Sequence, residues 1–440
     1  MNERTRKLVK YVLPSTLSML SVFLFTVIDG IFVGRGVGTD ALGAVNIAFP
    51  FIMIFSALVM CTTVGGLTIT AIRKGRGDEE GANAAFLHSL TMTTIVSAFF
   101  CLLGTVFVRQ MAHLMGANET FFSMVCDYIF WYAVFMIPCG LCSLFNGFCR
   151  NDDDPYLVSA GTIIATTLNI FGDWLFVFPL HMGLKGAAIA TGLSQTIGMF
   201  ISLSHFFTKR KGTLRFGKVK ADPELFKLII VRGMPECISQ FNAPLCVIFT
   251  NIVILRMLGD TAENAFSVIG YVAAFSVAVF LGVAEGLQPL FGNCYGARNE
   301  EDLLWYRKMG LIIGFTGALV IYIALLFLGR PICALYGLDE ATMECTMAAM
   351  PQYSTGFLIQ SFTVILSSYL YSTTKTREAV TINVLRSFVV NTVVIFLLPE
   401  IFGPGSIWYT FPVYEAILLV IAVWITRKAD QKGVIGKNLE

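Results

Sequence analysis

Long runs of apolar residues, separated by short polar segments, extend along the whole sequence. Each run reaches about 20 residues or more, the length that an α-helix needs to cross the hydrocarbon core of a bilayer. Twelve such spans are predicted, near residues 8–34, 42–71, 83–111, 121–149, 155–178, 184–208, 225–257, 262–294, 303–329, 343–372, 377–401 and 406–428. We therefore interpret the chain as an all-α polytopic membrane protein with twelve transmembrane helices.

The composition agrees with this interpretation. Hydrophobic residues make up 56% of the 440 residues and charged residues only 14%, whereas soluble domains have about 25% charged residues. The net charge of +2 gives no strong basic field, so we expect no nucleic-acid partner. The basic N-terminal segment MNERTRKLVKYVLP lacks a small-residue cleavage site, which favours a retained first span over a removable signal.

The distribution of basic residues predicts the orientation of the chain. With both termini placed in the cytoplasm, 26 of the 31 Lys and Arg residues fall on the cytoplasmic side. The outer side keeps Arg35, Arg109, Lys185, Arg256 and Arg330. This asymmetry is what the positive-inside rule requires of a multi-pass protein with an even number of spans. We expect a plasma-membrane protein with both termini cytoplasmic.

The two halves of the sequence repeat each other. A shift of 221 residues aligns Pro14 with Pro235 and Gly65 with Gly286, and other matches hold the same offset. Two halves of six spans each have the same orientation, which is the arrangement of parallel-repeat transporters. We predict two pseudo-symmetric six-helix lobes, residues 1–207 and 225–440, joined by a basic cytoplasmic linker at 208–224.

One carboxylate, Asp29, lies near the end of the first span. A charged residue in a span costs at least about 2.5 kcal/mol at the bilayer centre, so such a residue suggests a function. Counting 1.5 Å per residue from the predicted span ends brings Asp29 to the depth of three other polar residues, Asn169, Asp173 and Thr191. Asn169 and Asp173 are four residues apart and therefore share one helix face.

A small cation could bind to these two carboxylates, one amide and one hydroxyl in two ways. Their oxygens are hard ligands that suit Na⁺, and two nearby carboxylates in a low dielectric can instead share one proton. The coupling ion, H⁺ or Na⁺, therefore stays open, and no other cofactor is expected. The four histidines form no ligand pair, so we expect no metal other than Na⁺ at Asp29, Asn169, Asp173 and Thr191. The sequence has no Walker A motif, which argues against ATP as the energy source.

Four further positions are candidates for substrate binding or helix bending. Tyr128 lies at the predicted depth of Asp29 and is either a chamber residue or part of the packing. Glu236 and Gln240, one turn apart in the seventh span, are either cleft residues that attract cations or structural polar residues beside Pro235. Pro14 is a candidate site for a bend of the first helix.

Three motifs resemble those of one transporter family. They are Gly286-Leu-Gln-Pro-Leu-Phe-Gly-Asn-Cys-Tyr-Gly-Ala-Arg298, Val27-Ile-Asp-Gly-Ile-Phe-Val-Gly34 and Gly147-Phe-Cys-Arg-Asn-Asp-Asp-Asp-Pro155. The chain is similar over nearly its whole length to the MATE (multidrug and toxic compound extrusion) transporters. The resemblance implies a twelve-helix fold of two lobes around a central cleft, and export of cationic amphiphiles in exchange for H⁺ or Na⁺.

Within that family the pattern is closer to the DinF-like branch than to the NorM-like branch. In the DinF-like branch the N-lobe polar group is the coupling site, and Pro14, Asp29, Asn169, Asp173 and Thr191 stand where that pattern requires them. The NorM-like branch carries an acid further along the seventh span. Here no acid occurs between Glu236 and Asp260.

We therefore predict a secondary active multidrug antiporter rather than an enzyme. Its expected partners are small cationic or amphiphilic molecules and the lipid bilayer, and a monomer is expected. The alternative is a lipid-linked precursor flippase of the same superfamily, which would need several basic residues in its cavity. Arg386 is the main candidate for such a residue, but it lies at the predicted depth of Glu415 and is expected to pair with it.

Overall fold

The computed structural model describes residues 2–37, 39–117, 119–207, 212–218, 220–335, 340–431 and 433–434. Within these segments the regular structure is helical, and no strand occurs. The chain divides into two compact units. The N-terminal unit is Val9–Cys237, and the C-terminal unit is Ile238–Glu440 together with Met1–Leu8. The lobe and linker limits of the sequence analysis remain predictions.

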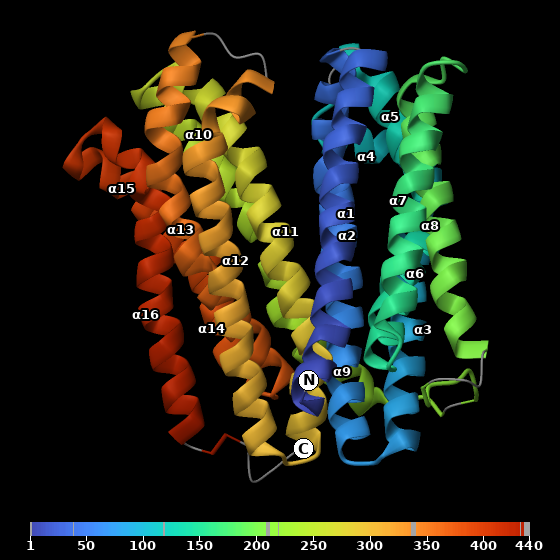
Figure 1. The fold of residues 1–440 in the computed structure, drawn as a ribbon. Helices are drawn as coiled ribbons and strands as arrows, with labels where there is room; N and C mark the ends of the chain where they lie inside the picture. Colours follow the sequence, from blue (N-terminus) through green and yellow to red (C-terminus); the bar gives the residue numbers. More distant parts are fainter. Residues whose placement is uncertain are drawn as a thin grey trace. The chain divides into compact units, whose positions relative to one another are not determined.

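The N-terminal unit contains most of the first nine helices. They are α1 (Glu3–Gly36), α2 (Thr39–Gly75), α3 (Glu79–Val106), α4 (Val108–Leu114), α5 (Glu119–Val134), α6 (Met136–Asn151), α7 (Pro155–Val177), α8 (Gly183–Phe207) and α9 (Pro223–Ser239). Helices α2 and α3 pack against each other and against α5 and α6, while α8 packs against α5, α6 and α7. Figure 1 shows the long helices of this unit running along a common direction.

The C-terminal unit contains the remaining elements. They are α10 (Asn242–Met257), α11 (Asp260–Gly296), α12 (Glu300–Leu335), α13 (Glu340–Ser372), α14 (Thr376–Val384), the π-helix η1 (Leu385–Val390), α15 (Asn391–Phe402), the 3₁₀-helix η2 (Pro404–Tyr409) and α16 (Thr410–Gln431). Helix α13 is the centre of this unit because it packs against α11, α12 and α16. The first turn of α1 belongs here, since Arg4 Nη2 lies 2.9 Å from Glu301 Oε1 at the start of α12.

The described helices account for the twelve predicted spans, but these helices differ in length and in apolar character. Ten spans are long and apolar enough to cross a membrane, or eleven if the bent pair α5–α6 counts as one. The remaining predicted span, 343–372, is α13, which has 33 residues. Many of its buried side chains are Ser, Thr or Gln. A span can be this polar because helices of its own unit, rather than lipid alone, surround it.

Two predicted spans are interrupted, and each interruption precedes a proline. The span at 121–149 bends by 51° between α5 and α6. Pro138 has no N–H to donate to the carbonyl of Val134, the last residue of α5. In the span at 225–257, Pro244 has the same relation to Gln240, where α9 has ended and α10 has not begun. Each break therefore lies at the carbonyl that a proline leaves without a backbone N–H donor.

The motif 147–155 contains a buried carboxylate that holds several segments together. Asp152 is fully buried, and its Oδ1 lies 2.7 Å from Lys74 Nζ of α2. Its Oδ2 lies 3.0 Å from His205 Nε2 of α8 and accepts the backbone N–H of Leu214 at 3.1 Å. Gly212, at φ 70°, fits here because a Cβ would lie 1.9 Å from Asp152 Oδ2.

The contacts of Asp152 determine its charge state. Burial alone would raise the pKa of this carboxyl, but the hydrogen bond from His205 and the Lys74 ammonium together bring the pKa below its usual range. Asp152 is therefore ionised at neutral pH, and it stabilises the fold as the anion.

Asp152→Ala should destabilise the protein by about 3 kcal/mol at pH 7, because the largely buried Lys74 ammonium loses its partner at 2.7 Å and keeps only Asp153 at 3.7 Å. A lowered folded-state pKa means that this contribution is present above the unfolded pKa of about 3.9 and is lost as the pH falls through the folded value. Thermal unfolding of the purified protein at pH 7 and at lower pH measures both effects. The exposed Glu80→Gln is the control. Equal melting temperatures for D152A and the wild type would contradict the assignment.

Candidate ion-coupling site

Helix α1 carries Asp29 and continues through Pro14 without a break. The Ser18 hydroxyl donates to the Pro14 carbonyl at 2.9 Å, and Thr26 donates in the same way to the carbonyl of Val22 at 3.0 Å. Such back-bonding satisfies polar side chains within the helix, where lipid offers no partner. The predicted bend at Pro14 is not a break of the helix in this structure.

Helices α7 and α8 supply the other three predicted residues. Asn169 and Asp173 of α7 are 2% and 0% exposed, and Thr191 lies opposite them on α8. In one orientation the side-chain amide of Asn169 forms hydrogen bonds with both Asp173 and Thr191. Its nitrogen then donates to Asp173 Oδ2 at 3.0 Å, and its oxygen accepts from Thr191 N at 3.1 Å and from Thr191 Oγ1 at 3.2 Å. A directed chain of hydrogen bonds thus runs from Thr191 through Asn169 to Asp173.

Asp29 completes the group from α1. Its carboxyl lies close enough to that of Asp173 for the two groups to interact directly. Two ionised carboxylates repel each other at this range in a low dielectric, so a shared proton or a bound cation would relieve the repulsion. Asp29 Oδ1 and Asp173 Oδ1 are buried and have no hydrogen-bond partner in the described part of the chain. The structure therefore brings together all four residues that the depth count aligned.

Two tyrosines of α5 lie beside the carboxyl pair. The Tyr128 phenol is close enough to interact electrostatically with Asp29 and Asp173, and Tyr132 interacts in the same way with Asp29. The ring centroids are 6.1 Å apart, as expected for residues one turn apart. Tyr128 was a predicted candidate and Tyr132 was not. The four-residue spacing of the two tyrosines nevertheless indicates that they share one helix face.

The break between α5 and α6 lies close to this group. Phe135, the residue between the two helices, has its ring against Gly192 of α8, where a Cβ would lie 2.1 Å from the ring. Glycine at this position lets the bent span approach α8 next to Thr191. The other predicted positions lie elsewhere in the chain, Glu236 near the end of α9 and Gln240 in the break before α10.

A second buried charge pair lies in the C-terminal unit. Arg386 Nη2 is 3.4 Å from Glu415 Oε2, with side-chain exposures of 5% and 0%, so the expected pairing is confirmed. Thr363 Oγ1 donates to the same carboxylate oxygen at 2.7 Å. Arg386 belongs to the π-helix η1, and this basic residue is therefore committed to an acid of its own unit.

The oxygen donors around Asp29 and Asp173 come from two carboxyls, an amide and a hydroxyl. In the orientation that satisfies its neighbours, Asn169 directs its amide nitrogen at the carboxyl pair and its oxygen at Thr191. The described residues contain no group of three or more His, Cys, Asp or Glu side chains placed to hold a metal. The two carboxyls could share a proton or ligate Na⁺, so both predicted ions remain candidates.

Comparison with known proteins identifies the family. The model of the MatE family matches residues 14–175 and again residues 235–397. The two matches begin 221 residues apart, the offset at which the sequence repeats. The chain therefore belongs to the MatE family of membrane transporters, which confirms the resemblance found in its motifs. The DinF-like branch remains a prediction.

Curated relatives span nearly the same length. The FAD transporter of Shewanella oneidensis is 25% identical over 353 residues, covering 77% of this chain and 76% of its own. The probable multidrug resistance protein YoeA of Bacillus subtilis is 25% identical, covering 94% and 92% of the two chains. The multidrug export protein MepA of Staphylococcus haemolyticus is 20% identical, covering 98% and 95%. These relatives are transporters, in agreement with the expectation of a non-enzyme.

Solved structures share the fold. An outward-facing multidrug resistance MATE family transporter of the MOP superfamily superposes with a TM-score of 0.91 at 21% identity, covering 98% of this chain and 97% of that one. A MATE in the bent conformation gives 0.88 and one in the straight conformation 0.91, both at 21% identity, with 98% of this chain and 97% of each of theirs covered. The predicted class, an all-α multi-span transporter, is confirmed.

Thr191→Val should reduce transport about three- to tenfold, because it removes the hydroxyl that donates to Asn169, and a net hydrogen bond contributes about 0.5–1.5 kcal/mol. Flux into proteoliposomes measures the effect. Thr196→Val on the same helix is the matched control, since the Thr196 hydroxyl donates only to the backbone carbonyl of Gly192. Unchanged flux in T191V would exclude a role for the hydroxyl.

Proposed function

We propose that this protein exports small cationic or amphiphilic molecules in exchange for H⁺, which binds at Asp29 and Asp173. The observation that carries the proposal is the close approach of two buried carboxyls from α1 and α7. Because one proton shared by the pair removes the repulsion between them, gain or loss of that proton changes how α1 is held against α7. The family membership and the relatives named for multidrug export support a drug-like substrate.

Coupling follows from this local chemistry. When the pair carries its proton, the contact between the two carboxyls ties α1 to α7. When the proton leaves, two like charges face each other in a low dielectric and repel. A protonated and a deprotonated pair therefore favour different positions of α1. Export requires that proton and substrate bind the two conformers with different affinities.

Asp29→Asn should abolish proton-driven transport, because the amide cannot release a proton. Substrate flux is measured in proteoliposomes under a pH gradient and, separately, under a Na⁺ gradient. Wild-type flux is expected under the pH gradient, and Asp173→Asn should behave like D29N. The control is Asp127→Asn, an exposed acid on α5 next to Tyr128, which should transport normally.

Three outcomes would overturn parts of the proposal. Proton-driven flux in D29N would exclude the carboxyl pair as the coupling site. Flux under the Na⁺ gradient alone would assign Na⁺ as the ion. Because one relative is an FAD transporter, the experiment includes FAD beside a cationic dye, and transport of FAD alone would replace the cationic substrate class with an anionic one.

A further inference from the structure

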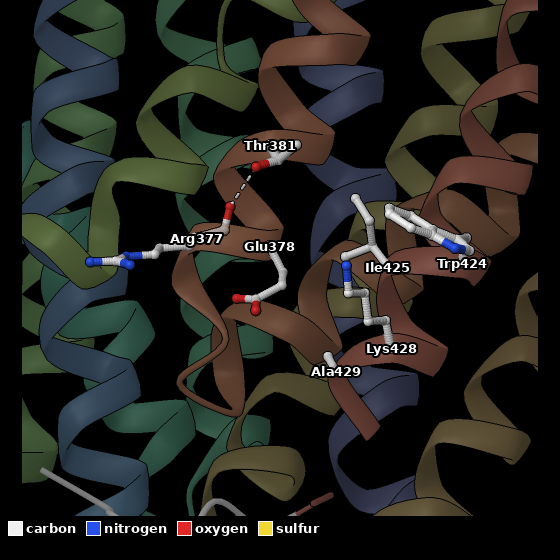
Figure 2. A pocket seen from close by; sticks show the side chains of 7 residues that line it. All are labelled: Arg377, Glu378, Thr381, Trp424, Ile425, Lys428 and Ala429. Carbon is white, nitrogen blue, oxygen red and sulfur yellow. Dashed lines mark hydrogen bonds between the residues drawn. The ribbon is translucent and has the colours of Figure 1, made fainter. Parts of the chain in front are cut away.

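A pocket opens between the beginning of α14 and the end of α16, far along the chain from the carboxyl pair. Its volume is about 280 Å³. The lining residues are Arg377, Glu378, Thr381, Trp424, Ile425, Lys428 and Ala429 (Figure 2). Because α14 begins where α16 ends, the pocket lies at one end of the helices, on the side where the basic residues predict the cytoplasm.

Opposite charges face this pocket without neutralising each other. Figure 2 shows Glu378 on the α14 side and Lys428 on the α16 side, whereas the Arg377 guanidinium extends away from Lys428. Within the described residues neither Glu378 nor Lys428 has an ion pair, while the nearby Lys375 is bound to Asp430 at 2.7 Å. Lys428 Nζ lies 4.9 Å above the Trp424 ring. The N-terminus of α14 adds a partial positive charge.

The surface leading away from the pocket is apolar. On α16, Ile417, Val420 and Trp424 are 41%, 71% and 60% exposed, and their spacing places them on the helix face of Lys428. Phe388 and Val389, beyond α14 on the same span, are also exposed. An aromatic ring between an apolar stripe and a lysine is the arrangement of a membrane interface. The pocket thus lies where a lipid headgroup meets its acyl chains.

We propose that this pocket binds the headgroup of a phospholipid with a primary amine, of the phosphatidylethanolamine type. Lys428 and the N-terminus of α14 face the phosphate, and Glu378 accepts hydrogen bonds from the ammonium. A choline headgroup has no N–H for Glu378. A headgroup that is only anionic would place its charge near the Glu378 carboxylate. The acyl chains lie along Ile417 and Val420.

Native mass spectrometry of the purified full chain tests this site with two lipids that differ only in the headgroup. Dioleoyl phosphatidylethanolamine should occupy the protein at least threefold more than dioleoyl phosphatidylcholine. Glu378→Gln should bring this ratio close to one, because the amide lacks the charge that selects the ammonium. Lys428→Gln should weaken both lipids. Glu300→Gln, an exposed acid in the first turn of α12, is the matched control and should keep the wild-type ratio.

The source of the headgroup is tested with soluble competitors. Glycerophosphoethanolamine and inorganic phosphate should not displace the lipid at millimolar concentration, because neither has acyl chains. Displacement by either would show a site for a free phosphate compound instead. Equal occupancy by the two lipids, stronger binding of dioleoyl phosphatidylglycerol, or an unchanged ratio in E378Q would overturn the proposal. None of these measurements depends on transport. Their results therefore test the lipid site independently of the proposed exchange mechanism.

Discussion

The close approach of the Asp29 and Asp173 carboxyls is the contact on which the N-terminal unit's chemistry depends. In a bilayer an isolated charge has no water to solvate it, so each acid needs a proton, a cation or a polar partner. The surrounding groups supply polar partners through hydrogen bonds: Thr191 donates to Asn169, and Asn169 donates to Asp173. Within this group of four residues, Asp29 Oδ1 and Asp173 Oδ1 are buried and lack a hydrogen-bond partner in the described structure. These two oxygens are therefore open to a further ligand.

The two units solve the problem of a buried acid differently. In the N-terminal unit two acids face each other, and neutralising them takes a proton or a cation. In the C-terminal unit Glu415 faces Arg386, and the pair is neutral without any ion. The repeat therefore preserved the helices but not the chemistry of their interior. A neutral pair also leaves Arg386 engaged, which weakens the alternative of a flippase with several free basic residues in its cavity.

Much of the site could be predicted from the sequence because helices have a constant rise. Counting residues from the span ends was enough to bring Asp29, Asp173 and Thr191 to one level. The count could not show the direction of the Asn169 amide, which depends on neighbours from α7 and α8 together. It also missed the bend at Phe135. Pro138 marks that bend in the sequence, but prolines such as Pro14 lie within unbroken helices, so the residue alone does not decide.

The polarity of α13 has a consequence for how the protein is made. A helix with this many Ser, Thr and Gln side chains gains less from lipid than a more apolar span of the same length does. Its polar side chains become buried only when α11, α12 and α16 surround it. Of these three helices, α16 follows α13 in the sequence. The polar side chains of α13 therefore lack part of their final surroundings until α16 has been made.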